Sequence, residues 1–238
     1  MRRAILVSIF IAAFCLASHA QESTTSGTGW TVDFTPYLWM AGQSGDVTVR
    51  GIIVRDVDIS FSDAVKDLDM GLAGHLEATR GNWTLLFDAQ YMNLSESPEV
   101  LIIRLKNTIA EIGGGYHLNP HFEVLGGVRI IKYRLELTPR NDRTYDQSKT
   151  WGDPFVGGQV SGKLGEKFTV SARGDIGGFG LGSDFAWNVN LAGSYRFARW
   201  GSFYIAQRWL DVDYKSEEDG LKINLLTAGP VLGLTFHF

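Results

Sequence analysis

The segment that says most about the architecture of this chain reads Trp187-Asn188-Val189-Asn190-Leu191-Ala192-Gly193-Ser194-Tyr195-Arg196. Apolar or aromatic residues occupy every second position, and most of the positions between them are polar. A period of two places alternate side chains on opposite faces of a β-strand, whereas a helix would repeat about every 3.6 residues. The same alternation recurs at 170–176 and 226–238. The sequence therefore predicts an all-β fold.

Outward from this segment, the pattern predicts about ten strands, with eight as the alternative. The predicted strands span residues 30–42, 70–80, 83–95, 102–118, 121–137, 149–163, 167–179, 185–198, 201–214 and 222–238. Tight turns such as Arg80-Gly81-Asn82 join some strands, and longer polar segments, above all 43–69, join the others. This asymmetry is typical of an outer-membrane barrel. We therefore predict a transmembrane antiparallel up-and-down β-barrel with both termini on the periplasmic, short-turn side.

A soluble β-sandwich is the alternative fold, and it would turn its apolar face inward and its polar face outward. Here the polar face carries charges in mid-strand and aromatic residues cluster near strand ends, which favours a barrel in lipid. We expect an aromatic girdle on the turn side formed by Tyr116, Phe122, Phe168, Tyr195, Phe197, Trp200 and Phe203. A second girdle, on the loop side, is expected from Tyr91, Tyr133, Trp151, Phe179, Trp187, Trp209 and Tyr214.

Residues 1–20 are predicted to be a secretory signal peptide. Arg2 and Arg3 precede an apolar stretch at 4–17, and small residues at Ser18 and Ala20 suit a cleavage site. A retained anchor helix is the alternative, but a helix over 4–17 would reach about 21 Å, short of the roughly 30 Å hydrocarbon core. Residues 21–29 are expected to be a polar periplasmic tether, and residues 30–238 the barrel. Cleavage would remove Cys15, the one cysteine, and with it disulfides and thiol chemistry.

Composition and charge exclude further classes of protein. The chain has 238 residues, 45% hydrophobic and 20% charged, which excludes a disordered chain and indicates a single domain or barrel. Removing Arg2 and Arg3 lowers the formal net charge from −4 to −6, which argues against a nucleic-acid-binding groove. After residue 21 no apolar run is long enough for a transmembrane helix.

The last nine residues alternate and end on phenylalanine, reading Pro230-Val231-Leu232-Gly233-Leu234-Thr235-Phe236-His237-Phe238. This segment resembles the terminal strand that marks Gram-negative outer-membrane proteins for barrel assembly, with Phe236 and Phe238 as the assembly signal. Residues 37–42, 57–63 and 74–78 resemble a widespread family of uncharacterised proteobacterial outer-membrane barrels. The resemblance implies the cell outer membrane as location, outer-membrane lipid and lipopolysaccharide as surroundings, and the barrel-assembly machinery as a partner in biogenesis. It brings no catalytic residue, cofactor or ligand.

Signals for chemistry are sparse. An acidic stretch in the first long loop lacks the D-x-[DN]-x-[DN]-G pattern of a calcium loop, so we interpret it as a solvated loop with one helical turn at 64–68. Its carboxylates are Asp56, Asp58, Asp63, Asp67 and Asp69. Neither G-x-S-x-G nor H-E-x-x-H occurs, and the histidines are dispersed. We expect no catalytic residue, cofactor or metal. A histidine at the barrel rim within hydrogen-bond reach of both an acid and a Ser or Asp would reverse the expectation that this is not an enzyme.

Two prolines fall on the strands that must pair to close the barrel. Pro36 lies in the first predicted strand and Pro230 in the last. Proline lacks the N–H that a sheet ladder uses and is rare at paired interior positions. We therefore predict a bulge or missing hydrogen bonds at this seam.

Strand alternation predicts a polar network in the lumen, formed by His75, Glu77, Asp88, Glu111, Glu123, Arg129, Arg173, Asp175 and Arg196. Folding about the tight turns sets His75 opposite Asp88 and makes Glu111 a diagonal neighbour of Arg129. Arg173 is expected to pair with Asp175. About eight strands enclose a space that side chains just fill, so ten strands predict a mostly occluded, polar lumen.

Three functional classes follow from this architecture. The favoured one is an integral outer-membrane barrel with a largely plugged lumen and a structural or surface-interaction role. The alternative is a narrow porin-like channel for small solutes or ions. A barrel-embedded hydrolase is the least favoured, because the sequence offers no recognisable nucleophile, base and acid. The sequence gives no indication of any ligand.

Overall fold

The computed structural model describes residues 29–49, 52–59, 68–96, 101–139, 145–216 and 220–238. The predicted signal peptide, most of the predicted tether and the helical turn expected at 64–68 lie outside these ranges, apart from residues 29 and 68. Among the described residues, no helix is long and apolar enough to span a membrane.

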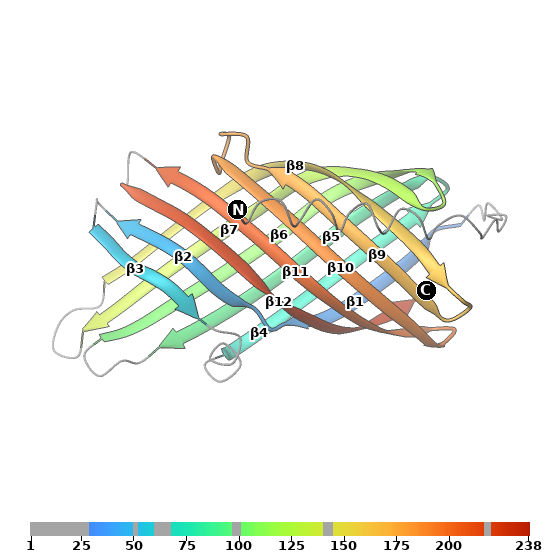
Figure 1. Ribbon diagram of the computed structural model, residues 1–238, viewed down its shortest axis with the longest axis horizontal. Helices are drawn as coiled ribbons and strands as arrows, with labels where there is room; N and C mark the ends of the chain where they lie inside the picture. The colour runs from blue at the N-terminus through green and yellow to red at the C-terminus, as the bar shows by residue number, and fades with distance from the viewer. Residues whose placement is uncertain (1–28, 50–51, 60–67, 97–100, 140–144, 217–219) are drawn as a thin grey trace, which may run out of the picture.

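The described chain forms an antiparallel barrel closed by ten strands (Figure 1). They are β1 (Thr31–Trp39), β4 (Leu68–Arg80), β5 (Trp83–Glu96), β6 (Leu101–Asn119), β7 (Phe122–Pro139), β8 (Tyr145–Leu164), β9 (Phe168–Gly177), β10 (Phe185–Ala198), β11 (Gly201–Ser216) and β12 (Leu221–His237). Each strand pairs with the next in this order, and β12 pairs with β1. The predicted fold class and strand number are confirmed.

The two ends of the barrel differ. The tight turns at 81–82, 120–121, 165–167 and 199–200 lie at one end, which we call the turn end. The last residue, Phe238, lies there too, and its N–H donates to the Val32 carbonyl at 2.9 Å. The opposite ends of the strands and the described β9–β10 connection at 178–184 lie at the other end, which we call the loop end (left in Figure 1). Both ends of the described chain therefore lie at the turn end.

A hairpin extends the barrel wall where the sequence predicted a loop. β2 (Gly42–Val49) continues the line of β1 and pairs with the loop-end half of β12, and β3 (Ile52–Ile59) folds back on β2. The prediction of a loop throughout 43–69 is therefore wrong. Gln43 and Val47 show the strand pattern in this segment. Both side chains are buried, and they alternate with exposed residues along β2. Asp56 and Asp58, assigned to a solvated loop, lie within β3, and Asp69 lies within β4, whereas Asp63 and Asp67 lie outside the described residues.

The seam between β1 and β12 is interrupted. Phe34 pairs with Phe236 and Tyr37 with Gly233, in one constant register, but the ladder skips Thr35 and Pro36 between them. Proline has no N–H to donate, so a gap at this position is expected. The prediction of missing ladder bonds is confirmed at Pro36, without a bulge. Beyond the end of β1 the carbonyl of Pro230 still accepts a hydrogen bond, from the N–H of Met40 at 2.9 Å.

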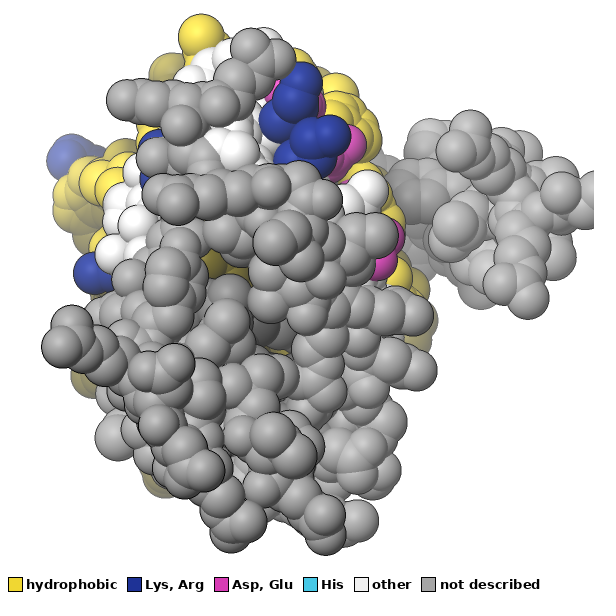
Figure 2. All heavy atoms as spheres, turned by 90° about the vertical axis from the view of Figure 1, so that its left-hand side faces the viewer, with side chains coloured by type: hydrophobic (Ala, Val, Ile, Leu, Met, Phe, Trp, Pro, Cys, Tyr) yellow, Lys and Arg dark blue, Asp and Glu magenta, His cyan; other side chains and the backbone are white. Residues whose placement is uncertain are grey.

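The outer surface changes character halfway along the strands. In the turn-end half it is apolar, and Leu85, Ile112 and Val128 are 57%, 62% and 42% exposed. In the loop-end half, outward positions carry exposed polar side chains, including Thr108, Lys132, Ser148, Asp213, Lys222 and Asn224. Figure 2 looks onto the loop end and shows Lys, Arg, Asp and Glu side chains on the described part of its rim. The apolar belt thus lies mainly in the turn-end half, although Phe179, Leu181 and Phe185 around the β9–β10 connection are also exposed.

The prediction of two aromatic girdles on the outer surface agrees better with the structure at the turn end than at the loop end. At the turn end Phe168, Phe197 and Phe203 are exposed on the outer surface, with the Phe197 and Phe203 ring centroids 4.7 Å apart. At the loop end the prediction is wrong for Tyr133, Trp151 and Tyr214, which are buried inside the barrel. They were assigned by their nearness to strand ends. Their place in the alternation puts them on the face of their strands that carries Arg129, Asp153 and Arg208, and that face points inward.

Candidate functional site

The middle of the lumen holds three arginines and three carboxylates, which we call the charged plug. Its members are Asp88, Glu111, Arg129, Arg173, Asp175 and Arg208. They come from β5, β6, β7, β9 and β11, at inward positions of each strand. Strand register aligns them, because Asp88 lies opposite Glu111 and Glu111 lies opposite Arg129. The plug therefore bridges the barrel from wall to wall.

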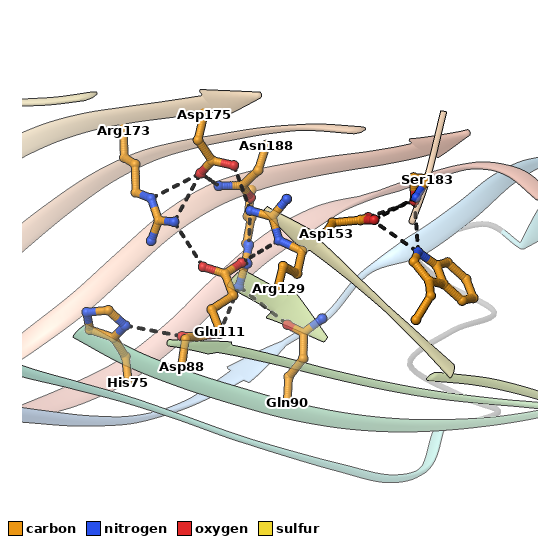
Figure 3. Close-up of polar contacts among 12 residues, drawn as sticks. His75, Asp88, Gln90, Glu111, Arg129, Asp153, Arg173, Asp175, Ser183 and Asn188 are labelled. Atoms are coloured by element: carbon orange, nitrogen blue, oxygen red, sulfur yellow. Dashed lines mark hydrogen bonds and ion pairs between the residues drawn. The ribbon is translucent and has the colours of Figure 1, made fainter. Parts of the chain in front are cut away.

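Arg129 is the most deeply buried member. Its Nε lies 2.8 Å from Oε1 of Glu111 and its Nη2 lies 2.6 Å from Oδ1 of Asp175, and all three side chains are 0% exposed. Arg173 contacts the same two carboxylates, at 2.9 Å and 3.0 Å (Figure 3). The Arg129 guanidinium also lies over the Phe155 ring, 5.2 Å from its centroid. Two arginines thus share two carboxylates in the centre of the plug.

Arg208 links this centre to the β1 wall. It lies 3.0 Å from Oε1 of Glu111 and 3.4 Å from Oδ1 of Asp88, and it donates to the Tyr37 hydroxyl at 3.2 Å. Tyr37 in turn donates to Asp88 at 2.9 Å. The Arg208 guanidinium also lies 5.0 Å from the centroid of the Trp39 ring.

The plug is electrically balanced, and each of its charged groups has an oppositely charged partner. Three guanidinium groups face three carboxylates, and every carboxylate lies within 4.0 Å of an arginine. Taking an unpaired charge out of water costs several kcal/mol, so such a cluster is stable only when its pairing is complete. Removing one member leaves an uncompensated charge inside the barrel.

The structure brings most of the predicted lumen residues together. His75 lies opposite Asp88 in register, with Nδ1 3.3 Å from the carboxylate, and Glu77 lies 3.6 Å from the same histidine. Glu111 is the direct cross-strand partner of Arg129, not the diagonal neighbour that was predicted.

Glu123 and Arg196 lie away from the plug. Glu123 is 3.8 Å from His117 near the turn end, and Arg196 is exposed at the turn-end rim. Sequence reasoning missed Arg208, although it alternates with Ala206 and Leu210 on the inward face of β11.

The loop-end half of the lumen is mainly apolar, although buried Gln43, Asn107 and Thr227 also lie there, which corrects the prediction of a polar lumen in this half. Its core contains Ile109, Ile131, Leu210, Val212 and Leu225, each at most 1% exposed. Above them the rings of Tyr133, Trp151 and Tyr214 stack, with centroids 5.8 Å and 4.0 Å apart. The lumen is thus mainly apolar in the loop-end half, where outward positions carry exposed polar side chains.

The β9–β10 connection at 178–184 completes this half of the wall. Fully buried Ser183 donates its N–H to Asp153 Oδ1 at 2.6 Å, and its hydroxyl lies 2.7 Å from Oδ2 (Figure 3). The Trp151 indole donates to that hydroxyl at 2.8 Å. These bonds fix the connection against β8.

The turn-end half contains a cavity of about 360 Å³, which we call the vestibule. Its walls are mainly polar, its lining includes Glu166 and Lys167 at the turn-end rim, and Arg173 and Arg208 of the plug form its floor. Among the described residues no cluster of three or more His, Cys, Asp or Glu side chains could hold a metal ion. The vestibule is therefore a polar chamber that reaches the turn end and stops at the plug.

No family model matches this chain, and no curated protein matches its sequence. Among solved structures, the outer-membrane protease OmpT from Escherichia coli has a similar fold, with a TM-score of 0.54 and 10% identity, over 92% of this chain and 99% of that one. Ail, the attachment invasion locus protein of Yersinia pestis, gives a TM-score of 0.45 at 12% identity, over 89% and 100%. The translocator domain of the Neisseria meningitidis autotransporter NalP gives 0.43 at 10%, over 98% and 95%.

A fold shared with a protease does not establish an activity, because one fold hosts many functions. What the similarity to OmpT supports is the architecture. This chain has the closed antiparallel β-barrel fold of outer-membrane proteins.

Proposed function

We propose that this protein is an integral barrel of the cell outer membrane, with its turn end in the periplasm and a lumen closed to solutes. Its role is structural or surface-interacting. The apolar belt supports this placement, because a β-barrel in lipid exposes an apolar band roughly 25 Å tall. The aromatic side chains near the turns, such as Trp200 and Phe203, would meet one membrane interface. Outer-membrane lipid and lipopolysaccharide would surround the belt, and the barrel-assembly machinery would act on Phe236 and Phe238.

The observation that carries the closed lumen is the burial of Arg129 and Ile131. Both are inward residues of β7, one in the plug and one in the apolar core, and both are 0% exposed. A solute crossing the barrel would have to displace paired charges and then enter a core lined by aliphatic side chains. Both steps cost several kcal/mol. The geometry therefore favours a plug over a narrow channel.

The loop-end half supports the surface role. Its exterior carries polar side chains, such as exposed Thr108, Lys132 and Lys222, and its interior is a packed, mainly apolar core. This is the arrangement of a water-soluble barrel. In the proposed placement, this half would project beyond the lipid and present charged walls and loops to the medium.

Refolded protein in detergent tests both parts of the proposal. Unboiled and boiled samples are expected to migrate differently in detergent gels, because a closed barrel has no free edge from which to unfold. In planar bilayers the same preparation should give at most a small conductance, with an open porin as the positive control. Identical migration would contradict the integral barrel, and a large steady conductance would contradict the plug.

A further inference from the structure

His237 is placed between a serine and an aspartate at the turn end. Its Nε2 lies 2.7 Å from the Ser202 hydroxyl, and its Nδ1 lies 2.7 Å from Oδ1 of Asp33. The three residues come from the adjacent strands β11, β12 and β1. A rim histidine in contact with both an acid and a hydroxyl is the arrangement that would indicate an enzyme, and His237 has both contacts.

Strand pairing fixes this arrangement. Asp33 is the cross-strand partner of His237 on β1, and Ser202 is the partner of Thr235 on β12, two residues before the histidine. All of them occupy inward positions and line the vestibule. The Ser202 residue is 3% exposed, whereas the His237 and Asp33 side chains are 17% and 48% exposed. The hydroxyl is thus sheltered inside a chamber that reaches the turn end.

Neither His75 nor His117 has this order of contacts. His75 places an acid at each ring nitrogen, Asp88 at one and Glu77 at the other. His117 meets both Thr84 and Glu123 through the same nitrogen, Nε2, at 3.1 Å and 3.8 Å. A proton relay needs the acid on one nitrogen and the hydroxyl on the other, so that the acid orients the ring while the free nitrogen takes the proton.

We propose that Ser202, His237 and Asp33 form a catalytic triad that hydrolyses esters inside the vestibule. Asp33 accepts the Nδ1–H of neutral His237, which leaves Nε2 free to act as general base. The Ser202 oxygen bonds to the ester carbonyl carbon while its proton passes to Nε2. The bond to the alcohol then breaks, and the alcohol leaves with that proton.

Water completes the reaction. It gives a proton to His237 as its oxygen adds to the carbonyl carbon of the acylated serine. The bond to Ser202 breaks, His237 returns the proton to the serine oxygen, and a carboxylic acid leaves. Arg196, the cross-strand partner of Ser202 on β10, lines the same chamber and supplies positive charge for the developing oxyanion.

The chamber selects the substrate class. About 360 Å³ lies near the lower end of ordinary ligand pockets. Val231 is the one aliphatic residue among its described lining, so the walls offer few aliphatic contacts to a long acyl chain. We therefore assign the site to short-chain carboxylic esters carried on a polar body that enters from the turn end.

The test uses refolded full-length protein, a fluorophosphonate label and two chromogenic esters, p-nitrophenyl acetate and p-nitrophenyl palmitate. Wild type should take up the label and hydrolyse the acetate, and Ser202→Ala should lose both. Asp33→Asn and His237→Asn should lower the acetate rate on the order of 10³-fold or more. Ser161→Ala, at another inward serine of the turn end, is the matched control and should match wild type.

Each variant is first checked for the mobility shift between unboiled and boiled samples, so that misfolding is not mistaken for lost chemistry. Equal labelling of wild type and Ser202→Ala would overturn the triad. It would leave the three residues as hydrogen bonds that only tie the seam together. Palmitate hydrolysis as fast as acetate hydrolysis would overturn the assignment to short-chain esters.

Discussion

Arg129→Ala removes the most deeply buried charge of the plug. Glu111 and Asp175 lose their contacts at 2.8 Å and 2.6 Å. Three carboxylates then face two arginines, and the two carboxylates that lose a partner have side chains that are 0% exposed. Arg173 still contacts both carboxylates, and Arg208 still contacts Glu111. The loss is therefore partial.

The magnitude follows from this geometry. Breaking a buried ion pair by removing one partner typically costs about 3–5 kcal/mol. Because both carboxylates keep another arginine, we expect a loss near the lower end, about 3 kcal/mol in the free energy of unfolding. For a domain of this size, 1 kcal/mol shifts Tm by about 2–4 °C, which gives a decrease of about 6–12 °C.

The assay is the temperature at which half of the refolded protein changes from the folded to the unfolded gel band. Arg196→Ala, which removes an exposed arginine from the same lumen, is the control and should change this temperature little. Adding Asp175→Asn to Arg129→Ala leaves two arginines and two carboxylates in the plug and should recover part of the loss. The current in planar bilayers should stay small in all these variants.

Two results would refute the reasoning. An unfolding temperature for Arg129→Ala within 1 °C of wild type would mean that the plug contributes no net stability. A large rise in steady conductance without a loss of stability would mean that Arg129 gates a channel.

Neighbouring residues provide two further predictions. Ile131→Ala should lower the free energy of unfolding by about 2–5 kcal/mol, because Ile131 is 0% exposed, whereas Ile130→Ala at its 47% exposed neighbour should cost much less by the same gel assay; equal losses would contradict the apolar core. Ile112→Arg, within the apolar belt, should cost about 2–4 kcal/mol in urea unfolding from lipid vesicles, and Thr108→Arg, four positions nearer the loop end on the same face of β6, should cost about 1 kcal/mol or less; similar costs would place the lipid boundary elsewhere.

Strand bounds and the inward face were predictable, because both follow from a period of two that needs no tertiary information. The segment 185–198 was placed at its observed limits, and the alternation turned Asp88, Glu111 and Arg129 inward as found. The hairpin β2–β3 was missed because polar and acidic residues within 43–58 read as a solvated loop. The hairpin becomes part of the barrel wall because β2 pairs with β12, which lies far along the chain.

The contacts between lumen side chains were less predictable from the sequence than the strands that carry them. The alternation shows which face a residue occupies, but not how high in the barrel it lies. Predicting the level at which the interior changes from polar to apolar therefore requires the stagger of all ten strands. Asp33 and His237 stand 204 positions apart, and the barrel brings them together only where its ends meet. No local motif could have shown this contact.

The interrupted seam has a kinetic consequence. Neighbouring strands can pair early and locally, but β12 reaches β1 only after the chain between them has been gathered, and contacts of such sequence separation form slowly. Ser202, His237 and Asp33 span that last junction. Any reaction they catalyse is therefore absent from every partly assembled form and begins only when the barrel has closed. Turnover would then report that assembly is complete.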